Sequence, residues 1–106
     1  MAYRRVYTRV GNSPVTTFPT AIKAEFDRLV SEGIVTRTET FVTSPAELIE
    51  QNIGANQFKS TVTEVWRSQE DFRNYRNWTD TNYQTVFNEY ISTHNIVQTI
   101  VSAGEI

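Results

Sequence analysis

The sequence contains no cysteine, which excludes disulfide bonds, thiolate metal sites, iron–sulfur clusters and cysteine nucleophiles. It has one histidine, so a metal site built from several histidines is excluded as well. Only four glycines are present, and they form no glycine-rich loop of the kind that binds phosphates. The lack of cysteine fits a reducing compartment, and we expect a cytoplasmic protein without a cofactor or a bound metal.

Long apolar runs and a basic excess are also missing. The longest uninterrupted apolar run is Met1-Ala2-Tyr3, whereas a membrane-spanning helix needs about 20 such residues. Arg4 and Arg5 are followed by alternating tyrosine and valine rather than by the apolar core of a signal peptide. Ten basic and twelve acidic residues give a formal net charge of −2, which argues against a nucleic-acid-binding domain. We therefore expect neither a membrane nor a nucleic acid as partner.

The chain has the length and composition of one folded domain. It has 106 residues, of which 39% are hydrophobic and 12% aromatic, enough to form a core without metal or disulfide. We found no repeat or linker, so residues 1–106 are predicted to form a single domain.

Strand and helix patterns alternate along the chain. The clearest helix carries Ile22, Phe26, Leu29 and Val30 on one stripe and ends at Gly33. In chain order the elements are a strand over 2–10, a helix over 19–32, a strand over 34–43, a short helix over 45–53, a strand over 58–67, a helix from 68 that is interrupted at 78–81 and resumes at 82, and a strand over 96–101. Residues 11–14 are expected to form a loop, and the tail 102–106 is expected to fray.

This order predicts a ferredoxin-like α+β fold. With the short helix over 45–53 taken as an insertion between the second and third strands, the pattern is the split βαβ arrangement. It implies an antiparallel four-stranded sheet with two main helices on one face. The residues before the short helix and before the last helix support their predicted starts. Ser44 and Ser68 can each accept a hydrogen bond from a backbone N–H of the first helical turn.

The strands carry apolar residues on both faces without a clean apolar and polar alternation. That pattern indicates that both faces are at least partly covered, and a second copy of the sheet would form the second cover in a homodimer. Charged strand residues need an explanation; they are Arg5, Arg9, Arg37, Glu39 and Glu64. They must lie at strand ends, pair across strands or line a hydrated cavity, because an unpaired buried charge is costly. Charged strand edges are a rival explanation that requires no dimer.

The run Glu64-Val65-Trp66-Arg67-Ser68-Gln69-Glu70, followed by Phe72, resembles a motif of the antibiotic-biosynthesis-monooxygenase-like family. The resemblance implies a dimeric α+β barrel, in which each subunit of a homodimer keeps a cavity between sheet and helices. Some members oxidise polycyclic aromatic substrates without a cofactor, some cleave haem, and many have no known activity. Haem-handling members place a histidine where this chain has Tyr75, and the short helix over 45–53 is an addition, so haem is disfavoured.

Four residues are candidates for lining a ligand pocket: Trp66, Tyr75, Glu64 and Tyr7. The aromatic rings could form a pocket wall, but aromatics at this spacing are more often core. Glu64 could point into the cavity or pair with Arg37 across the strands.

Other charged and titratable residues have structural explanations. His94 lies at a predicted helix end, where a cation is favoured by the helix dipole. The acidic pairs Glu47 with Glu50 and Glu70 with Asp71 lie at helix starts, which explains them as caps. Arg73 and Arg76 lie near two aromatics and could grip single-stranded nucleic acid, but neighbouring acids favour a solvated mixed-charge face.

The sequence therefore predicts a small homodimer that binds a ligand, such as a small aromatic molecule, or acts in assembly without catalysis. A cofactor-independent oxygenase that orients an aromatic substrate with Tyr75, Trp66 or His94 is the alternative. An accessory protein that joins a larger assembly through charged strand edges is a third possibility. The catalytic residues, if any, are not indicated.

Overall fold

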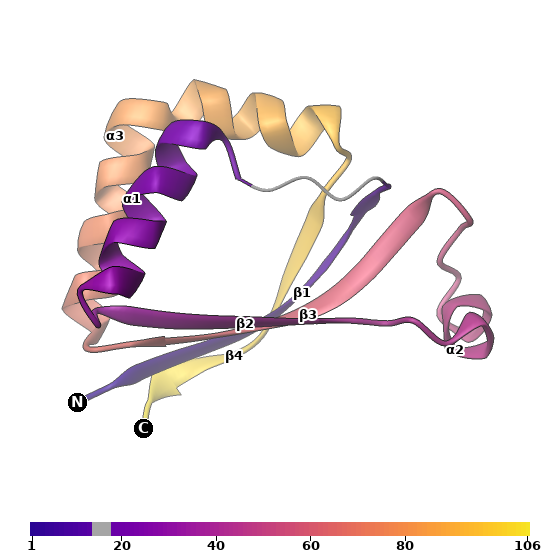
Figure 1. Ribbon diagram of the computed structural model, residues 1–106, viewed down its shortest axis with the longest axis horizontal. Coiled ribbons are helices and arrows are strands. Elements are labelled where there is room, and N and C mark those ends of the chain that lie inside the picture. The colour runs from indigo at the N-terminus through magenta and orange to yellow at the C-terminus, as the bar shows by residue number, and fades with distance from the viewer. Residues whose placement is uncertain (14–17) are drawn as a thin grey trace.

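The computed structural model describes residues 1–13 and 18–106 and has the predicted ferredoxin-like α+β architecture. The elements are β1 (Tyr3–Asn12), α1 (Thr20–Ser31), β2 (Val35–Phe41), α2 (Pro45–Glu50), β3 (Gln57–Trp66), α3 (Gln69–Thr93) and β4 (Val97–Glu105). All strand pairs are antiparallel in the order β2-β3-β1-β4, and α1 and α3 lie on one face of the sheet (Figure 1). The short α2 is the predicted insertion between β2 and β3.

Helix α1 buries its predicted apolar stripe against the sheet. Ile22, Phe26 and Leu29 are buried, and Gly33 ends the helix region with a φ of 73°, a value that favours glycine. Val30 was expected in the same stripe but is 42% exposed, because it lies at the edge of the packed face.

Helix α3 is interrupted as predicted, but the break lies at Tyr83 rather than at 78–81. Residues 78–81 are helical, and the only non-helical backbone within the helix is at Tyr83, with a φ of −136°. Figure 1 shows α3 running in two directions along its length. Thr79 and Asn82 donate side-chain hydrogen bonds to the carbonyls of Tyr75 and Trp78, so these polar residues bond within the helix instead of ending it.

The two ends of the sheet differ from the sequence prediction. Gly11 and Asn12 belong to β1 and pair with Phe58 and Gln57; Pro14 of the predicted loop lies outside the described residues. The tail does not fray, because β4 continues to Glu105 and pairs with β1 as far as Tyr3. The C-terminal ends of β1 and β4 are both decided by pairing with strands that are distant in sequence. Local patterns do not reveal these partners.

Apolar residues lie on both faces of the sheet, as the sequence pattern indicated, and each face has its own residue types. Buried and less buried residues alternate along β1 and β3. Tyrosine, tryptophan and most charged strand residues face the helices, whereas threonines and valines, together with Arg4 and Lys59, occupy the open face. A clean apolar and polar alternation is missing because arginine and glutamate occupy positions on the buried face.

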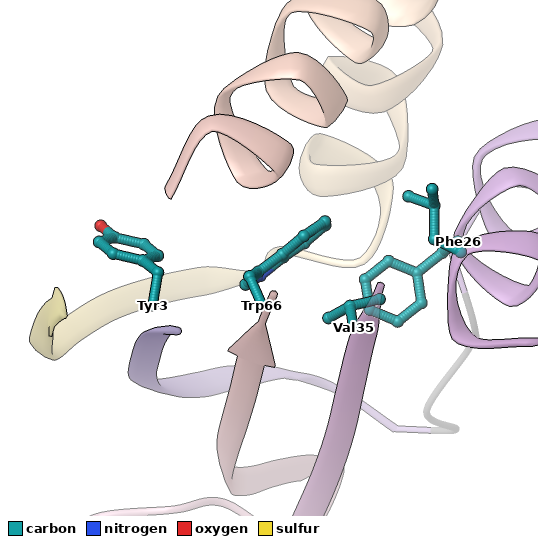
Figure 2. Packing of buried hydrophobic residues seen from close by; sticks show 5 residues of the cluster. Tyr3, Phe26, Val35 and Trp66 are labelled. Atoms are coloured by element: carbon teal, nitrogen blue, oxygen red, sulfur yellow. The ribbon is translucent and has the colours of Figure 1, made fainter. Parts of the chain in front are cut away.

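The core is built around Trp66, which is fully buried. Tyr3, Phe26, Leu29 and Val35 form one cluster with it, contributed by three strands and α1. Figure 2 shows the Trp66 ring between Tyr3 on one side and Val35 and Phe26 on the other.

Candidate functional site

Glu64 is the centre of a buried polar network on the helix-facing side of the sheet. It accepts hydrogen bonds from the Arg5 guanidinium at 2.8 Å, the Tyr7 hydroxyl at 2.7 Å and the Trp66 indole N–H at 3.0 Å. Arg5 and Arg37 both lie opposite Glu64 in the strand register, one on β1 and one on β2. The ion pair forms with Arg5 and not with Arg37; of the two alternatives considered for Glu64, the structure shows the position facing the cavity.

Glu39 is the centre of a second network on the same side. Its carboxylate accepts from Arg9 at 2.9 Å, from Arg37 at 3.1 Å and from the Ser60 hydroxyl at 2.6 Å. Burial alone would raise the pKa of Glu39, but the Ser60 hydrogen bond and the charges of Arg37 and Arg9 outweigh it and hold the pKa below its usual value. The strand charges therefore pair across strands, one of the arrangements predicted for them.

A cavity of about 290 Å³ lies between the sheet and α3, beside the Glu64 network. Its lining residues are Arg5, Tyr7, Phe18, Glu64, Tyr75, Arg76, Thr79, Asp80, Phe87, Ile91, Ile96 and Gln98. Polar groups of the strands and the first half of α3 line one part. Apolar side chains of the second half of α3, together with Phe18 and Ile96, line the other.

Three of the four candidate pocket residues lie together on this cavity: Tyr7, Glu64 and Tyr75. Trp66 does not line it. Its ring packs in the core at 5.9 Å from Phe26 and 5.4 Å from Tyr75, between ring centroids, so its role at the site is to position Glu64 through the indole N–H.

Sequence reasoning missed most of the apolar wall of the cavity and Arg76 at its rim. Arg5 and Tyr7 are two residues apart on β1, so the strand period places both on one face, and Arg5 was among the strand charges for which a cavity was one of the predicted locations. Phe87 and Ile91 are four residues apart on α3, a helical spacing that places both on one side of the helix, and this spacing is the signal that could have found them. Arg76 was placed on a solvated face, and it does lie exposed at the rim of the cavity.

The two tyrosines of the cavity are held in their protonated form. Burial raises the pKa of Tyr7, and the neighbouring Glu64 carboxylate raises it further. Burial likewise raises the pKa of Tyr75 to about 12. At neutral pH both phenols therefore remain uncharged groups that can donate a hydrogen bond.

We expect the stability of the protein to fall as the pH rises from 10 to 12. The pKa of Tyr75 is about 12 when folded and 10 when free, so its stabilising effect is fully present below pH 10 and is lost as the pH rises through 12. The loss is about 2–3 kcal/mol. Urea unfolding followed by circular dichroism at several pH values would measure it, and Tyr75→Phe should give a flatter curve. Tyr83→Phe, on the same helix but off the cavity, is the control; a curve for Tyr75→Phe as steep as that of the unmodified protein would contradict the prediction.

The remaining candidates have structural roles or lie away from the cavity. His94 is the C-cap of α3, and its ring lies 5.2 Å from that of Tyr90. Asp71 donates its backbone N–H to the Ser68 hydroxyl and its carboxylate accepts two bonds from Arg67, as a helix cap does. In the described part of the chain, no group of three or more histidine, aspartate or glutamate residues is placed to hold a metal ion.

No helix in residues 1–13 and 18–106 is both long and apolar enough to cross a membrane. Comparison of the chain with protein-family models, with curated proteins and with solved structures gave no match.

Proposed function

We propose that this protein binds a small organic molecule in the cavity between the sheet and α3, without catalysing a reaction on it. The proposal rests on one observation: the hydrogen-bonded ionic network of Glu64 and a set of apolar side chains line the same cavity. Ligand sites combine a mostly apolar lining with a few fixed polar groups in this way. A dry cavity of about 150 Å³ holds benzene, so 290 Å³ has room for a body of one or two rings.

The chemistry of the lining favours binding over catalysis. Glu64 accepts three hydrogen bonds and is ion-paired, so its carboxylate oxygens are already engaged within the protein. Tyr7 and Tyr75 hold their protons at neutral pH. A general base needs a free acceptor that faces the ligand, whereas the two phenols are protonated and the oxygens of Glu64 are engaged.

Membership of the antibiotic-biosynthesis-monooxygenase-like family, with a cofactor-independent oxygenase activity, stands as the second proposal. The βαββαβ fold and the position of the run 64–70 at the junction of β3 and α3 support it. It requires Tyr75 to orient an aromatic substrate. If Tyr75→Phe leaves the turnover of an oxidised substrate unchanged, this second proposal is wrong.

Binding in the cavity can be tested with indole, a neutral two-ring probe. We expect saturable binding to the full chain with a Kd below about 1 mM, observed as chemical-shift changes in an NMR titration. Phe87→Trp enlarges a side chain that lines the cavity, so it should weaken binding at least tenfold. Val86→Trp is the matched control, because Val86 is an exposed neighbour outside the lining. Binding that Phe87→Trp does not weaken would contradict the proposal.

We also propose a homodimer through the open face of the sheet, in the cytoplasm. One row across all four strands is formed by Thr40, Thr61, Thr8 and Thr99, and a second by Thr38, Thr63, Val6 and Ser102. These two rows contain no charged residue, and depletion of charge is typical of the centre of an interface. A two-fold axis through this region would place the rows of one copy on those of a second copy.

The dimer can be tested by light scattering across micromolar concentrations. Thr61→Lys places a charge at the centre of the open face and should weaken dimerisation at least tenfold, because the charge would be desolvated in the interface. Thr61 is exposed in the subunit, so its fold should be unaffected. Thr85→Lys, on the exposed side of α3, is the control. A purely monomeric unmodified protein would rule out the dimer.

A further inference from the structure

We infer that the outer edge of β4 pairs with the same edge of a second copy of this chain, so that two sheets join into one continuous antiparallel sheet. The outer edge is the side of β4 that faces away from β1. This contact differs from the dimer proposed through the open face, because it uses backbone groups at the side of the sheet. It does not depend on ligand binding in the cavity.

The outer edge of β4 carries backbone groups that no described strand meets. β4 is the last strand in the order β2-β3-β1-β4, and among the described strands it pairs only with β1. The Ile106 N–H donates to the Ala2 carbonyl at 3.0 Å, and Ala2 continues the open-face positions of β1. By the alternation of an antiparallel pair, the open-face residues of β4 therefore bond to β1, whereas Gln98 and Ala103 direct their N–H and C=O groups outwards. An extended strand offers the matching row of donors and acceptors.

The side chains of β4 leave this edge open. Residues 97–104 contain no charged residue and no proline, two of the devices that keep edge strands apart. Val101 is 62% exposed, and Ile100 is 50% exposed although it lies on the helix-facing side. Helix α3 therefore leaves room beside β4. The strand at the other edge, β2, differs because it carries Arg37 and Glu39.

A β-bulge in β4 sets the register of a two-fold contact. The pairing with β1 shifts after Val6 and leaves Val101 without a partner on β1. The side-chain alternation shifts with it, so that Thr99 before the bulge and Ser102 after it both lie on the open face. In two antiparallel copies of β4, Thr99 can therefore lie opposite Ser102 of the partner subunit on the same face. Cross-strand pairs of threonine with serine stabilise a sheet by hydrogen bonding.

The same register aligns the outward backbone groups. With Thr99 opposite Ser102 of the partner subunit, Gln98 lies opposite Ala103 of the partner subunit, and two-fold symmetry repeats both pairs. Gln98 and Ala103 can exchange two N–H···O=C hydrogen bonds in each pair, because both direct these groups outwards. A second copy therefore fits this edge in backbone groups and in side-chain faces, and it brings no like charges together over residues 97–104.

The edge contact is tested in the Thr61→Lys background, which disfavours the open-face contact. We expect light scattering of Thr61→Lys to show a monomer–dimer equilibrium at submillimolar concentration. Adding Ala103→Pro should weaken this dimer at least tenfold, because proline lacks the N–H that crosses the edge, whereas the bonds from β4 to β1 do not use this N–H. Ala103→Ser retains the N–H and is the matched control, so it should leave the dimer unchanged.

Amide hydrogen exchange tests the edge without a change in β4. In Thr61→Lys, we expect the amides of Gln98 and Ala103 to exchange at least fivefold more slowly at submillimolar than at low micromolar concentration. The amides of β2, at the other edge of the sheet, should keep their rates. This measurement decides the matter if Ala103→Pro does not fold.

Two results would overturn the inference. One is a Thr61→Lys protein that stays monomeric, with concentration-independent exchange at Gln98 and Ala103; a strand of a different protein would then be the remaining occupant of the edge. The other is a dimer that a folded Ala103→Pro variant does not weaken, because its contact would then lie elsewhere on the protein. Neither result bears on ligand binding in the cavity or on the open-face dimer of the unmodified chain.

Discussion

Glu64→Leu is expected to lower the free energy of unfolding by about 3–5 kcal/mol, because it removes one partner of a buried ion pair. Glu64 is 4% exposed, and three donors lose their acceptor at once: Arg5, Tyr7 and Trp66. The buried Arg5 guanidinium then loses the carboxylate with which it forms its ion pair. Urea unfolding monitored by circular dichroism at pH 7 would measure the loss.

A double variant distinguishes the lost charge from lost packing. Arg5→Met combined with Glu64→Leu removes both charges, and an apolar replacement of a whole buried pair is often neutral in stability. We therefore expect the double variant to recover most of the stability that Glu64→Leu loses. If the loss in free energy of unfolding of the double variant equals the sum of the losses of the two single variants, the ion pair does not couple the two residues.

Trp66→Ala is expected to cost about 3–5 kcal/mol, the range for removing a large aromatic side chain from a core. Trp66 is fully buried, and its ring lies 5.5 Å from that of Phe72 and 5.9 Å from that of Phe26, between centroids. The cavity left behind would border the strand β3 and both long helices. The same unfolding measurement applies, at a temperature where the variant is still folded.

The matched control for this variant is Trp66→Phe, which retains an aromatic ring and loses the indole N–H. Its cost should be clearly smaller than that of Trp66→Ala, since most of the packing remains and one hydrogen bond to Glu64 is lost. A loss below about 1 kcal/mol for Trp66→Ala would show that the core does not depend on this residue.

The Glu64–Trp66 spacing explains why one short run matters to both core and cavity. Residues two apart on a strand share a face, so the indole N–H can reach the carboxylate directly. The ring of Trp66 packs in the core, and the Glu64 side chain lines the cavity. The run 64–70 therefore has a structural explanation that does not depend on the family resemblance.

Local patterns were sufficient for the order of the elements but not for all of their ends. The apolar stripe of α1, its stop at Gly33 and the Ser68 cap of α3 act within a few residues, so the sequence reveals them. The extension of β1 to Asn12 and of β4 to Glu105 depends on partner strands. At Gly11 a Cβ atom would lie 2.8 Å from the Phe58 ring, so the glycine serves a cross-strand contact rather than a loop.

By itself the sequence determined the βαββαβ order and the single antiparallel sheet, because hydrophobic periodicity and caps are local properties. It also placed Tyr7, Glu64 and Tyr75 among the candidates. Only the tertiary structure decided that Glu64 pairs with Arg5 rather than Arg37, since both lie opposite it in the register. It also decided that Trp66 fills the core while Arg76 reaches the cavity, because burial and charge balance depend on how α3 packs over the sheet.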